Sequence, residues 1–139
     1  MIAFENDLTS KSMFDVGEKG YPYEVCGLLL GKVGDPKIVT EIFECGNLNK
    51  LKPETRYDMD PKDYLKGEAL ARQKGLEVLG IFHSHPDHPD RASETDRQAA
   101  WPGFSYIIMS IQKGKYFSMK SWVLDGQSQF QEESVLPRL

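Results

Sequence analysis

Two histidines separated by one residue, His83 and His85, follow an apolar run in the middle of the chain. If that run is a strand, side chains at i and i+2 point to the same face, so both imidazoles can reach one metal ion. Pro86 should end the strand, because proline cannot donate to the hydrogen-bond ladder. Asp96 falls in the expected first turn of the next helix. Two imidazoles and one carboxylate with an open fourth position commonly hold a catalytic zinc ion, so this segment predicts a metal site.

Taken one at a time, these residues have simpler interpretations. Ser93 is most simply a helix N-cap and Asp96 a partner of the helix dipole. Capping does not require two histidines on one face, so the combination favours metal binding. The other polar residues of the intervening loop are Asp87, His88 and Asp90. We interpret these three as loop residues rather than further ligands, because Pro86 and Pro89 redirect the backbone between them.

The spacing has a more specific meaning. From His83 to Asp96 the chain has the form H-x-H, seven residues, then S-x-x-D. This resembles the signature of the JAMM/MPN-plus zinc metallopeptidases (JAB domain, Mov34/MPN-like), and most of all their small bacterial members. That family also has a glutamate at the start of an upstream apolar strand, and Glu24 in YPYEVCGLLLG (21–31) matches it. By position alone, Glu24 would more simply be a solvated strand start.

The resemblance implies a role for each matching residue. His83, His85 and Asp96 would bind one zinc ion per chain. Glu24 would be the general base toward a zinc-activated water and would pass the proton to the leaving amine, which requires a carboxylate in a partly desolvated cleft. Ser93 would hydrogen-bond the tetrahedral intermediate and stabilise its oxyanion. Every ligand and catalytic position matches, so nothing here favours a metal-free member of the family.

Periodicity and turn residues predict the elements that must position these side chains. Helices are expected at 7–19, from Asp60 as N-cap to a stop at Gly75, and from Ser93 to about 101. Strands are expected at 25–30, 37–44, 76–82, 104–111 and 116–124, with room for one more edge strand after Gly126. The 76–82 run is mostly apolar, as expected of a central strand covered on both faces. This order predicts an α/β fold, an α+β sandwich. The resemblance implies a curved mixed sheet flanked by helices, related to the cytidine-deaminase architecture.

Length and composition bound the class of protein. The chain has 139 residues, which fits one domain over 1–139. The net charge is −4 and no basic cluster occurs, so nucleic acid is not an expected partner. The chain has no signal-peptide pattern at its start and no apolar run long enough to span a membrane. Two separate cysteines, Cys26 and Cys45, are expected to be buried and reduced, which favours a cytoplasmic location.

The resemblance also implies a substrate class. The predicted reaction is hydrolysis of an amide or isopeptide bond after the Gly-Gly C-terminus of a ubiquitin-like or sulfur-carrier protein, whose tail would add as a strand to a sheet edge. Two alternatives stay open: a non-catalytic MPN-type scaffold or binding module, and a zinc hydrolase acting on cell-wall or phage-tail peptides. The deaminase pair H-x-E and P-C-x-x-C and the peptidase motif H-E-x-x-H do not occur. Exposed sheet edges would permit a dimer.

Overall fold

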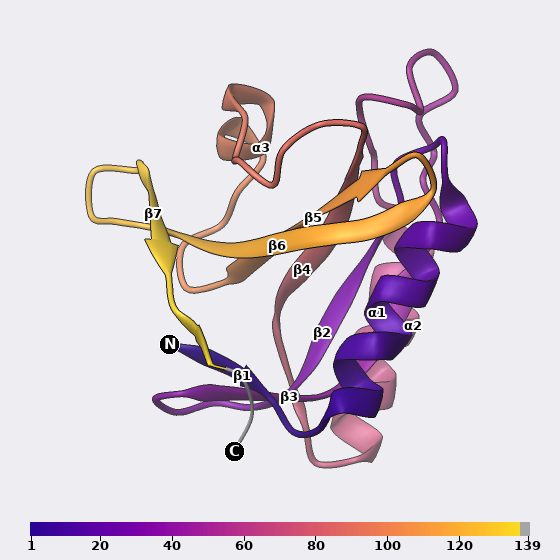
Figure 1. Ribbon diagram of the computed structural model, residues 1–139. Coiled ribbons are helices and arrows are strands. Elements are labelled where there is room, and N and C mark those ends of the chain that lie inside the picture. The colour runs from indigo at the N-terminus through magenta and orange to yellow at the C-terminus, as the bar shows by residue number, and fades with distance from the viewer. Residues whose placement is uncertain (137–139) are drawn as a thin grey trace.

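The computed structural model describes residues 1–136. Its elements in chain order are β1 (Ile2–Phe4), α1 (Asp7–Gly20), β2 (Cys26–Lys32), β3 (Lys37–Cys45), α2 (Pro61–Gln73), β4 (Glu77–Pro86), α3 (Glu94–Gln98), β5 (Ser105–Gln112), β6 (Lys115–Leu124), β7 (Phe130–Glu133) and β8 (Val135–Leu136). One mixed, 8-stranded sheet has the order β7-β6-β5-β4-β2-β3-β1-β8. The sheet curves until it is nearly closed, with β7 and β8 at its two ends (Figure 1). This confirms the predicted curved, mixed sheet with flanking helices.

Helices α1 and α2 cover opposite faces of the sheet. Along β2, Leu29 packs in the cluster that contains Met13 of α1, whereas Leu28 packs in the cluster that contains Ala71 of α2. Both leucines are fully buried, and each such side chain contributes about 1.5–3 kcal/mol of transfer free energy. The apolar run in β2 is therefore explained by burial on both faces.

Strand β4 carries the two histidines and lies in the centre of the sheet. It pairs antiparallel with β2 and parallel with β5, and it continues past the predicted end at 82 to Pro86. Gly80 permits the close approach of β5, because a Cβ there would lie 1.8 Å from the Ser105 carbonyl oxygen. Side chains alternate along a strand, so His83 and His85 share the face of Ile81, which packs on the α2 side.

The helix starts follow the capping chemistry in the sequence. Asn6 caps α1, and its Oδ1 accepts a hydrogen bond from the Thr9 amide at 3.1 Å. Asp60 caps α2, Pro61 occupies its first position, and Gly75 beyond its end has φ +68. Within residues 1–136, no helix is both long enough and apolar enough to cross a membrane.

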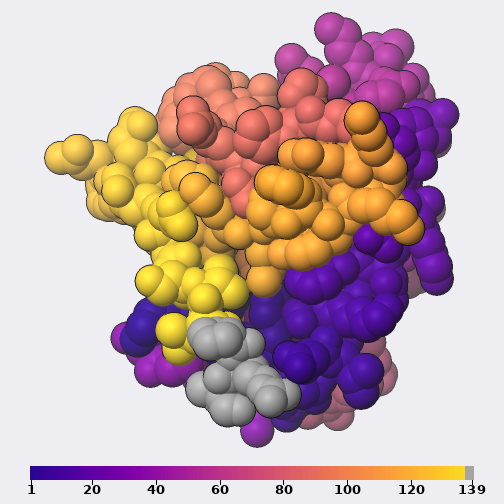
Figure 2. All heavy atoms as spheres, in the orientation of Figure 1, coloured from indigo at the N-terminus to yellow at the C-terminus, as the bar shows by residue number. Residues whose placement is uncertain are grey.

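The two chain ends of the described region differ from the prediction. The single edge strand expected after Gly126 is two short strands, β7 and β8, and strand β1 was not predicted. Strand β1 pairs parallel with β3 on one side and with β8 on the other. Three residues carry no periodicity, so β1 could not be predicted before its two neighbours were known. In Figure 2 the yellow C-terminal segment lies against the indigo N-terminal one.

Candidate metal centre and active site

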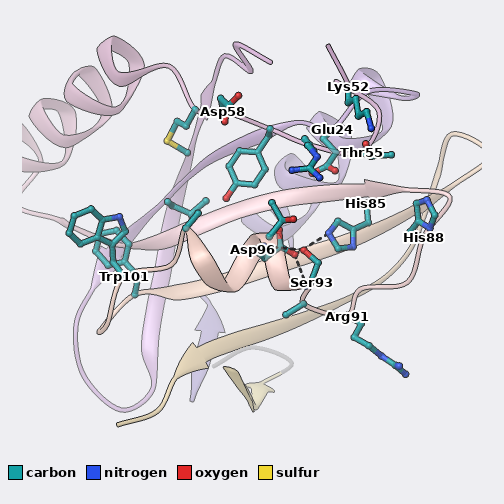
Figure 3. A pocket seen from close by; sticks show the side chains of 18 of the residues that line it. Glu24, Lys52, Thr55, Asp58, His85, His88, Arg91, Ser93, Asp96 and Trp101 are labelled. Atoms are coloured by element: carbon teal, nitrogen blue, oxygen red, sulfur yellow. Dashed lines mark hydrogen bonds and ion pairs between the residues drawn. The ribbon is translucent and has the colours of Figure 1, made fainter. Parts of the chain in front are cut away.

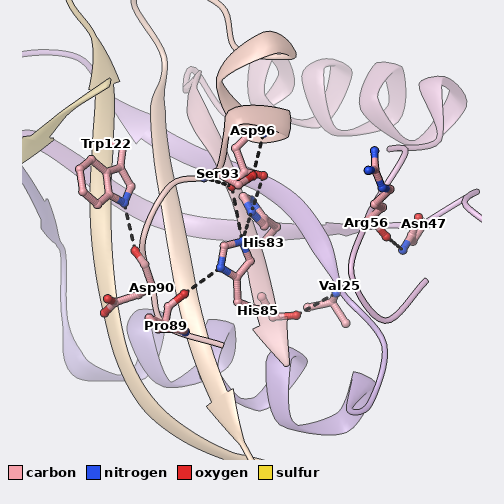
Figure 4. Close-up of polar contacts among 11 residues, drawn as sticks. Val25, Asn47, Arg56, His83, His85, Pro89, Asp90, Ser93, Asp96 and Trp122 are labelled. Carbon is pink, nitrogen blue, oxygen red and sulfur yellow. Dashed lines mark hydrogen bonds and ion pairs between the residues drawn. The ribbon is translucent and has the colours of Figure 1, made fainter. Parts of the chain in front are cut away.

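Three side chains from β4 and α3 converge on one point. The Nε2 atoms of His83 and His85 lie 3.2 Å apart. The Asp96 carboxylate lies 3.2 Å from Nε2 of His83 through Oδ1 and 3.4 Å from Nε2 of His85 through Oδ2. Figure 4 shows the two imidazoles on β4 directed at Asp96 on the first turn of α3. The structure thus brings together the three residues predicted as ligands.

The spacing of these donors fits a tetrahedral metal ion. Zinc ligands at about 2.0–2.2 Å from the ion place their donor atoms roughly 3.3–3.5 Å from one another. Glu24 also has a carboxylate oxygen close enough to make a group with His83 and His85, all three ligand atoms lying within 4.8 Å of one another. Asp96 is not in that group, but its carboxylate contacts both imidazoles, which leaves Asp96 and Glu24 as the two carboxylates that could complete the site.

The start of α3 fixes the position of Asp96. The Asp96 amide donates to Ser93 Oγ at 3.0 Å, and the Ser93 amide donates to the Asp96 carboxylate at 2.9 Å, a reciprocal capping box. One Asp96 oxygen therefore serves the helix cap while the carboxylate faces the histidines. Ser93 can therefore be both a helix cap and a group beside the predicted metal ligands; the two interpretations are compatible.

The two imidazoles are held by different contacts away from their Nε2 atoms. Nδ1 of His85 lies 2.8 Å from the Pro89 carbonyl oxygen, a contact that orients the ring with its Nε2 toward Asp96. His83 is fully buried, its Nδ1 has no hydrogen-bond partner among the described residues, and its ring lies against Tyr57 at a centroid distance of 4.6 Å. The Tyr57 ring therefore fixes His83 by packing rather than by hydrogen bonding.

The pKa shifts of His83 and Asp96 favour the forms that bind a metal, whereas that of His85 favours its protonated form. Burial lowers the pKa of His85, but hydrogen bonds to Asp96 and to the Pro89 carbonyl oxygen outweigh burial and raise it. Burial lowers the pKa of His83, which keeps its imidazole neutral. Burial disfavours the charged form of Asp96, but hydrogen bonds to His83 and His85 outweigh it and hold the Asp96 pKa below its ordinary value. A neutral imidazole and an ionised carboxylate are the forms that coordinate a metal.

Glu24 lies just before β2, with 5% of its surface exposed. Burial raises the pKa of its carboxyl to about 8, while the positive charges of His85 and Arg56 act in the opposite direction. A carboxyl group with a pKa this close to neutrality can both accept and release a proton near pH 7. The geometry thus gives Glu24 the environment that a general base requires.

The centre opens into a groove of roughly 1400 Å³. Its walls come from the loop 52–59, the start of α2 and the segment 85–104. Figure 3 shows Trp101 at one end of the groove and His88 and Arg91 at the other, with Asp96 and Ser93 between them. Trp101 is 68% exposed. The groove therefore has room for an extended peptide that runs past Asp96 and contacts groove residues on both sides of it.

The remaining polar residues of the β4–α3 loop lie outside the cluster. The Asp87 carboxylate accepts hydrogen bonds from the Tyr21 hydroxyl at 2.6 Å and from the Lys113 amide at 2.8 Å. His88 lines the groove, and Asp90 is buried and contributes its backbone carbonyl to the Trp122 indole. The group of possible metal ligands among the described residues includes none of the three.

The sequence can now be compared with known proteins. A family model for prokaryotic homologues of the JAB domain matches residues 10–125. The chain belongs to this family. The matched range contains Glu24, His83, His85, Ser93 and Asp96. The family match thus covers every residue of the motif and supports the resemblance seen in the sequence.

Relatives and a solved structure agree with this assignment. The JAB domain is 35% identical to a desampylase of Pyrococcus furiosus over 115 residues, 81% of this chain and 75% of that protein. It is 36% identical to a desampylase of Haloferax volcanii over 90 residues, 64% of this chain and 63% of that protein. The match thus spans less than two thirds of the Haloferax protein. A solution structure of a protein from Desulfitobacterium hafniense matches with a TM-score of 0.86 at 30% identity, covering 99% of this chain and 93% of that one.

Sequence reasoning assigned no role to the segment between β3 and α2. In the structure this segment forms a wall of the groove, with Arg56 near Glu24 and Tyr57 against His83. The one available signal was its content of turn-forming residues, namely Asn47, Asn49, Pro53 and Asp58. Such residues indicate a loop held by side-chain hydrogen bonds, but they do not indicate what the loop covers.

Proposed function

We propose that this domain, over 1–139, is a zinc-dependent peptidase or isopeptidase that cuts an amide bond after the Gly-Gly C-terminus of a ubiquitin-like or sulfur-carrier protein. The observation that carries the proposal is the convergence of His83, His85 and Asp96 at donor spacings of 3.2–3.4 Å, beside a groove that His85 and Asp96 line. A structural histidine pair would not need a carboxylate at tetrahedral spacing together with a buried glutamate beside it.

Each residue has a defined part in the proposed reaction. His83, His85 and Asp96 would hold one zinc ion, which supplies a Lewis acid for activating water and polarising the amide carbonyl. The Glu24 carboxylate takes a proton from the attacking water and delivers it to the leaving amine nitrogen. The Ser93 hydroxyl, which accepts from the Asp96 amide, keeps its own proton free to donate to the developing oxyanion.

The shape of the site favours a slender substrate. The side chains of His83, His85 and Asp96 are only 0%, 12% and 11% exposed. A tail of two glycines can approach such recessed groups, because it has no side chains to collide with the groove walls. The names of the two relatives, both desampylases, support a protein substrate of the ubiquitin-like class.

The proposal also covers location and assembly. We expect a cytoplasmic protein, since Cys26 and Cys45 are buried free thiols, and we expect neither a nucleic-acid nor a membrane partner. A dimer through a sheet edge stays an expectation, to be checked by the molar mass in solution.

Metal content and cleavage test the proposal together. Protein purified without chelator should carry about one zinc per chain, and a His83→Ala/His85→Ala variant should carry none. His88→Ala, a groove histidine outside the cluster, is the matched control and should retain zinc. The zinc form should release a reporter amine joined to the Gly-Gly end of a ubiquitin-like protein, but not from an Ala-Ala version.

Each other outcome selects an alternative. Absence of bound zinc, even after zinc is added, would contradict the proposed enzymatic function and favour a non-catalytic scaffold or binding module. Bound zinc without Gly-Gly cleavage, but with cleavage of cell-wall or phage-tail peptides, would favour the other hydrolase.

A further inference from the structure

Asn47 uses its whole hydrogen-bonding capacity beside the site. Its Nδ2 donates to the carbonyl oxygens of Glu24 at 3.2 Å and of Arg56 at 3.1 Å. Its Oδ1 accepts from the amides of Asn49 and Asp58, both at 2.9 Å. An amide has two donor hydrogens and two acceptor lone pairs, so every position is occupied. Figure 4 shows the contact with Arg56 across the loop.

Glu24 depends on this loop because it lies outside the sheet ladder. Strand β2 begins at Cys26, and Val25 is held by Ser84 of β4 through both its amide and its carbonyl. The Glu24 amide instead donates to the Pro53 carbonyl at 2.7 Å, and its carbonyl accepts from Asn47. The loop between β3 and α2 therefore holds the main chain of Glu24 from both sides.

The same asparagine fixes the opposite wall of the site. Asn47 bonds the main chain of Arg56 and of Asp58, the two residues that flank Tyr57. The Tyr57 ring lies 4.6 Å from the His83 ring, and its pKa is raised by burial, so that its hydroxyl stays protonated. One side chain thus joins the backbone of the base to the residue that packs on a metal ligand.

We infer that Asn47 is a positioning residue, which fastens the 48–58 loop to Glu24 and so fixes the distance between the base and the His83–His85–Asp96 cluster. The inference rests on the proposed function, in that it assigns the base role to Glu24. Misplacing a base by about 1 Å can cost roughly 100-fold in rate without loss of substrate binding. A residue that only stabilised the fold would instead change stability and leave the turnover of the folded protein unchanged.

A pair of asparagine-to-aspartate variants separates these possibilities. Asn47→Asp keeps the Oδ1 acceptor but loses both donors, including the one to Glu24. Asn49→Asp is the matched control, because Asn49 lies in the same loop and its side chain accepts from the amides of Leu51 and Lys52 and donates to Asp58, with no bond to Glu24. If Asn47→Asp fails to fold, Asn47→Ser, which retains one hydroxyl donor, takes its place.

Two measurements are made on each zinc-loaded variant. For Asn47→Asp we expect a kcat at least about tenfold lower with KM within about twofold, at unchanged zinc stoichiometry. Hydrogen exchange at the Glu24 amide, now bonded to Pro53, should become at least about tenfold faster. Asn49→Asp should leave kcat and this exchange rate within about twofold of the parent values.

The result can fail in distinguishable ways. An unchanged exchange rate and kcat in Asn47→Asp, or equal changes in Asn49→Asp, would overturn the positioning role. If the parent protein cleaves no Gly-Gly substrate, the proposed function fails, while the exchange comparison still decides whether Asn47 fastens Glu24 to the loop.

Discussion

The central property of this site at the residue scale is a carboxyl group that burial keeps from ionising. Glu24 is 5% exposed, and burial raises its pKa from 4.5 to about 8 in the protein without metal. A nearby divalent cation would favour the charged form and so would prepare Glu24 as a base. In the proposed mechanism, metal binding would therefore set the protonation state of Glu24.

The first residue-scale prediction concerns stability of the metal-free protein. A carboxyl with a raised folded pKa contributes its full stability below pH 4.5 and loses it as pH rises through about 8. Glu24→Gln should therefore match the parent near pH 4 but exceed its free energy of unfolding at pH 9 by on the order of 4 kcal/mol. Urea unfolding across pH measures this. Glu54→Gln, at an exposed position of the loop between β3 and α2, is the control, and equal pH curves for both variants would contradict the prediction.

Activity gives the second residue-scale prediction. Because Glu24 is proposed to move the proton rather than hold the metal, Glu24→Gln should lower kcat by at least about 100-fold while zinc stays bound. Elemental analysis and single-turnover cleavage measure the two quantities. Loss of zinc in this variant would instead identify Glu24, which can group with His83 and His85, as a ligand.

At the scale of elements, strand β4 and the short helix α3 together position the predicted metal ligands. The period of two along β4 places both histidines on one face, and the capping box of α3 orients Asp96 toward them. Helix α3 is only 5 residues long, so its cap carries a large share of its order. The N-terminus of α3 would therefore position the predicted ligand Asp96 in addition to capping the helix.

Two N-cap variants test this double role. Ser93→Ala and Asn6→Ala each remove a side chain that accepts from the first turn of a helix, and each should cost about 1 kcal/mol of stability. Only Ser93→Ala should also weaken zinc binding, by roughly tenfold or more, because the Asp96 amide loses the hydroxyl that anchors the first turn of α3 and with it the position of Asp96. Competition with a chromophoric chelator measures the zinc affinity. Equal affinities in the two variants would mean that the histidines fix Asp96 without the cap.

At the scale of the whole molecule, the site joins segments far apart in the chain. Glu24 precedes β2, the histidines end β4, and Asp96 starts α3, so Glu24 reaches the other three residues only through the fold. A ligand that binds only the folded state stabilises it by mass action. The metal is therefore expected to contribute to global stability as well as to catalysis.

Metal removal tests this coupling. At free zinc about 1,000 times the dissociation constant, binding adds about 4 kcal/mol, which corresponds to roughly 10 °C in Tm for a chain of this size. A chelator should remove that increment from the parent protein and change nothing in His83→Ala/His85→Ala. An equal effect of chelator on both proteins would locate the stabilising metal elsewhere.

The sequence by itself determined most of the local structure and predicted which side chains would meet at the candidate metal site. The apolar run before His83, the cap at Asp60 and the hairpin around Gly114 each depend on short-range rules, and all three elements occur within about two residues of their predicted positions or extend beyond them. The prediction that His83 and His85 share a face also depends on a short-range rule, because side chains alternate along a strand with a period of two.

Only the tertiary structure decided the rest, because the interactions concerned join residues distant in sequence. Strand β1 exists through pairing with β3 and β8, which no property of three residues can indicate. Asn47 contacts Glu24 from 23 residues away, and Tyr57 packs on His83 from a loop without periodicity. Local spacing fixes which side chains share a face, whereas burial and loop closure, which set the pKa of Glu24 and its position, arise only when the chain is folded.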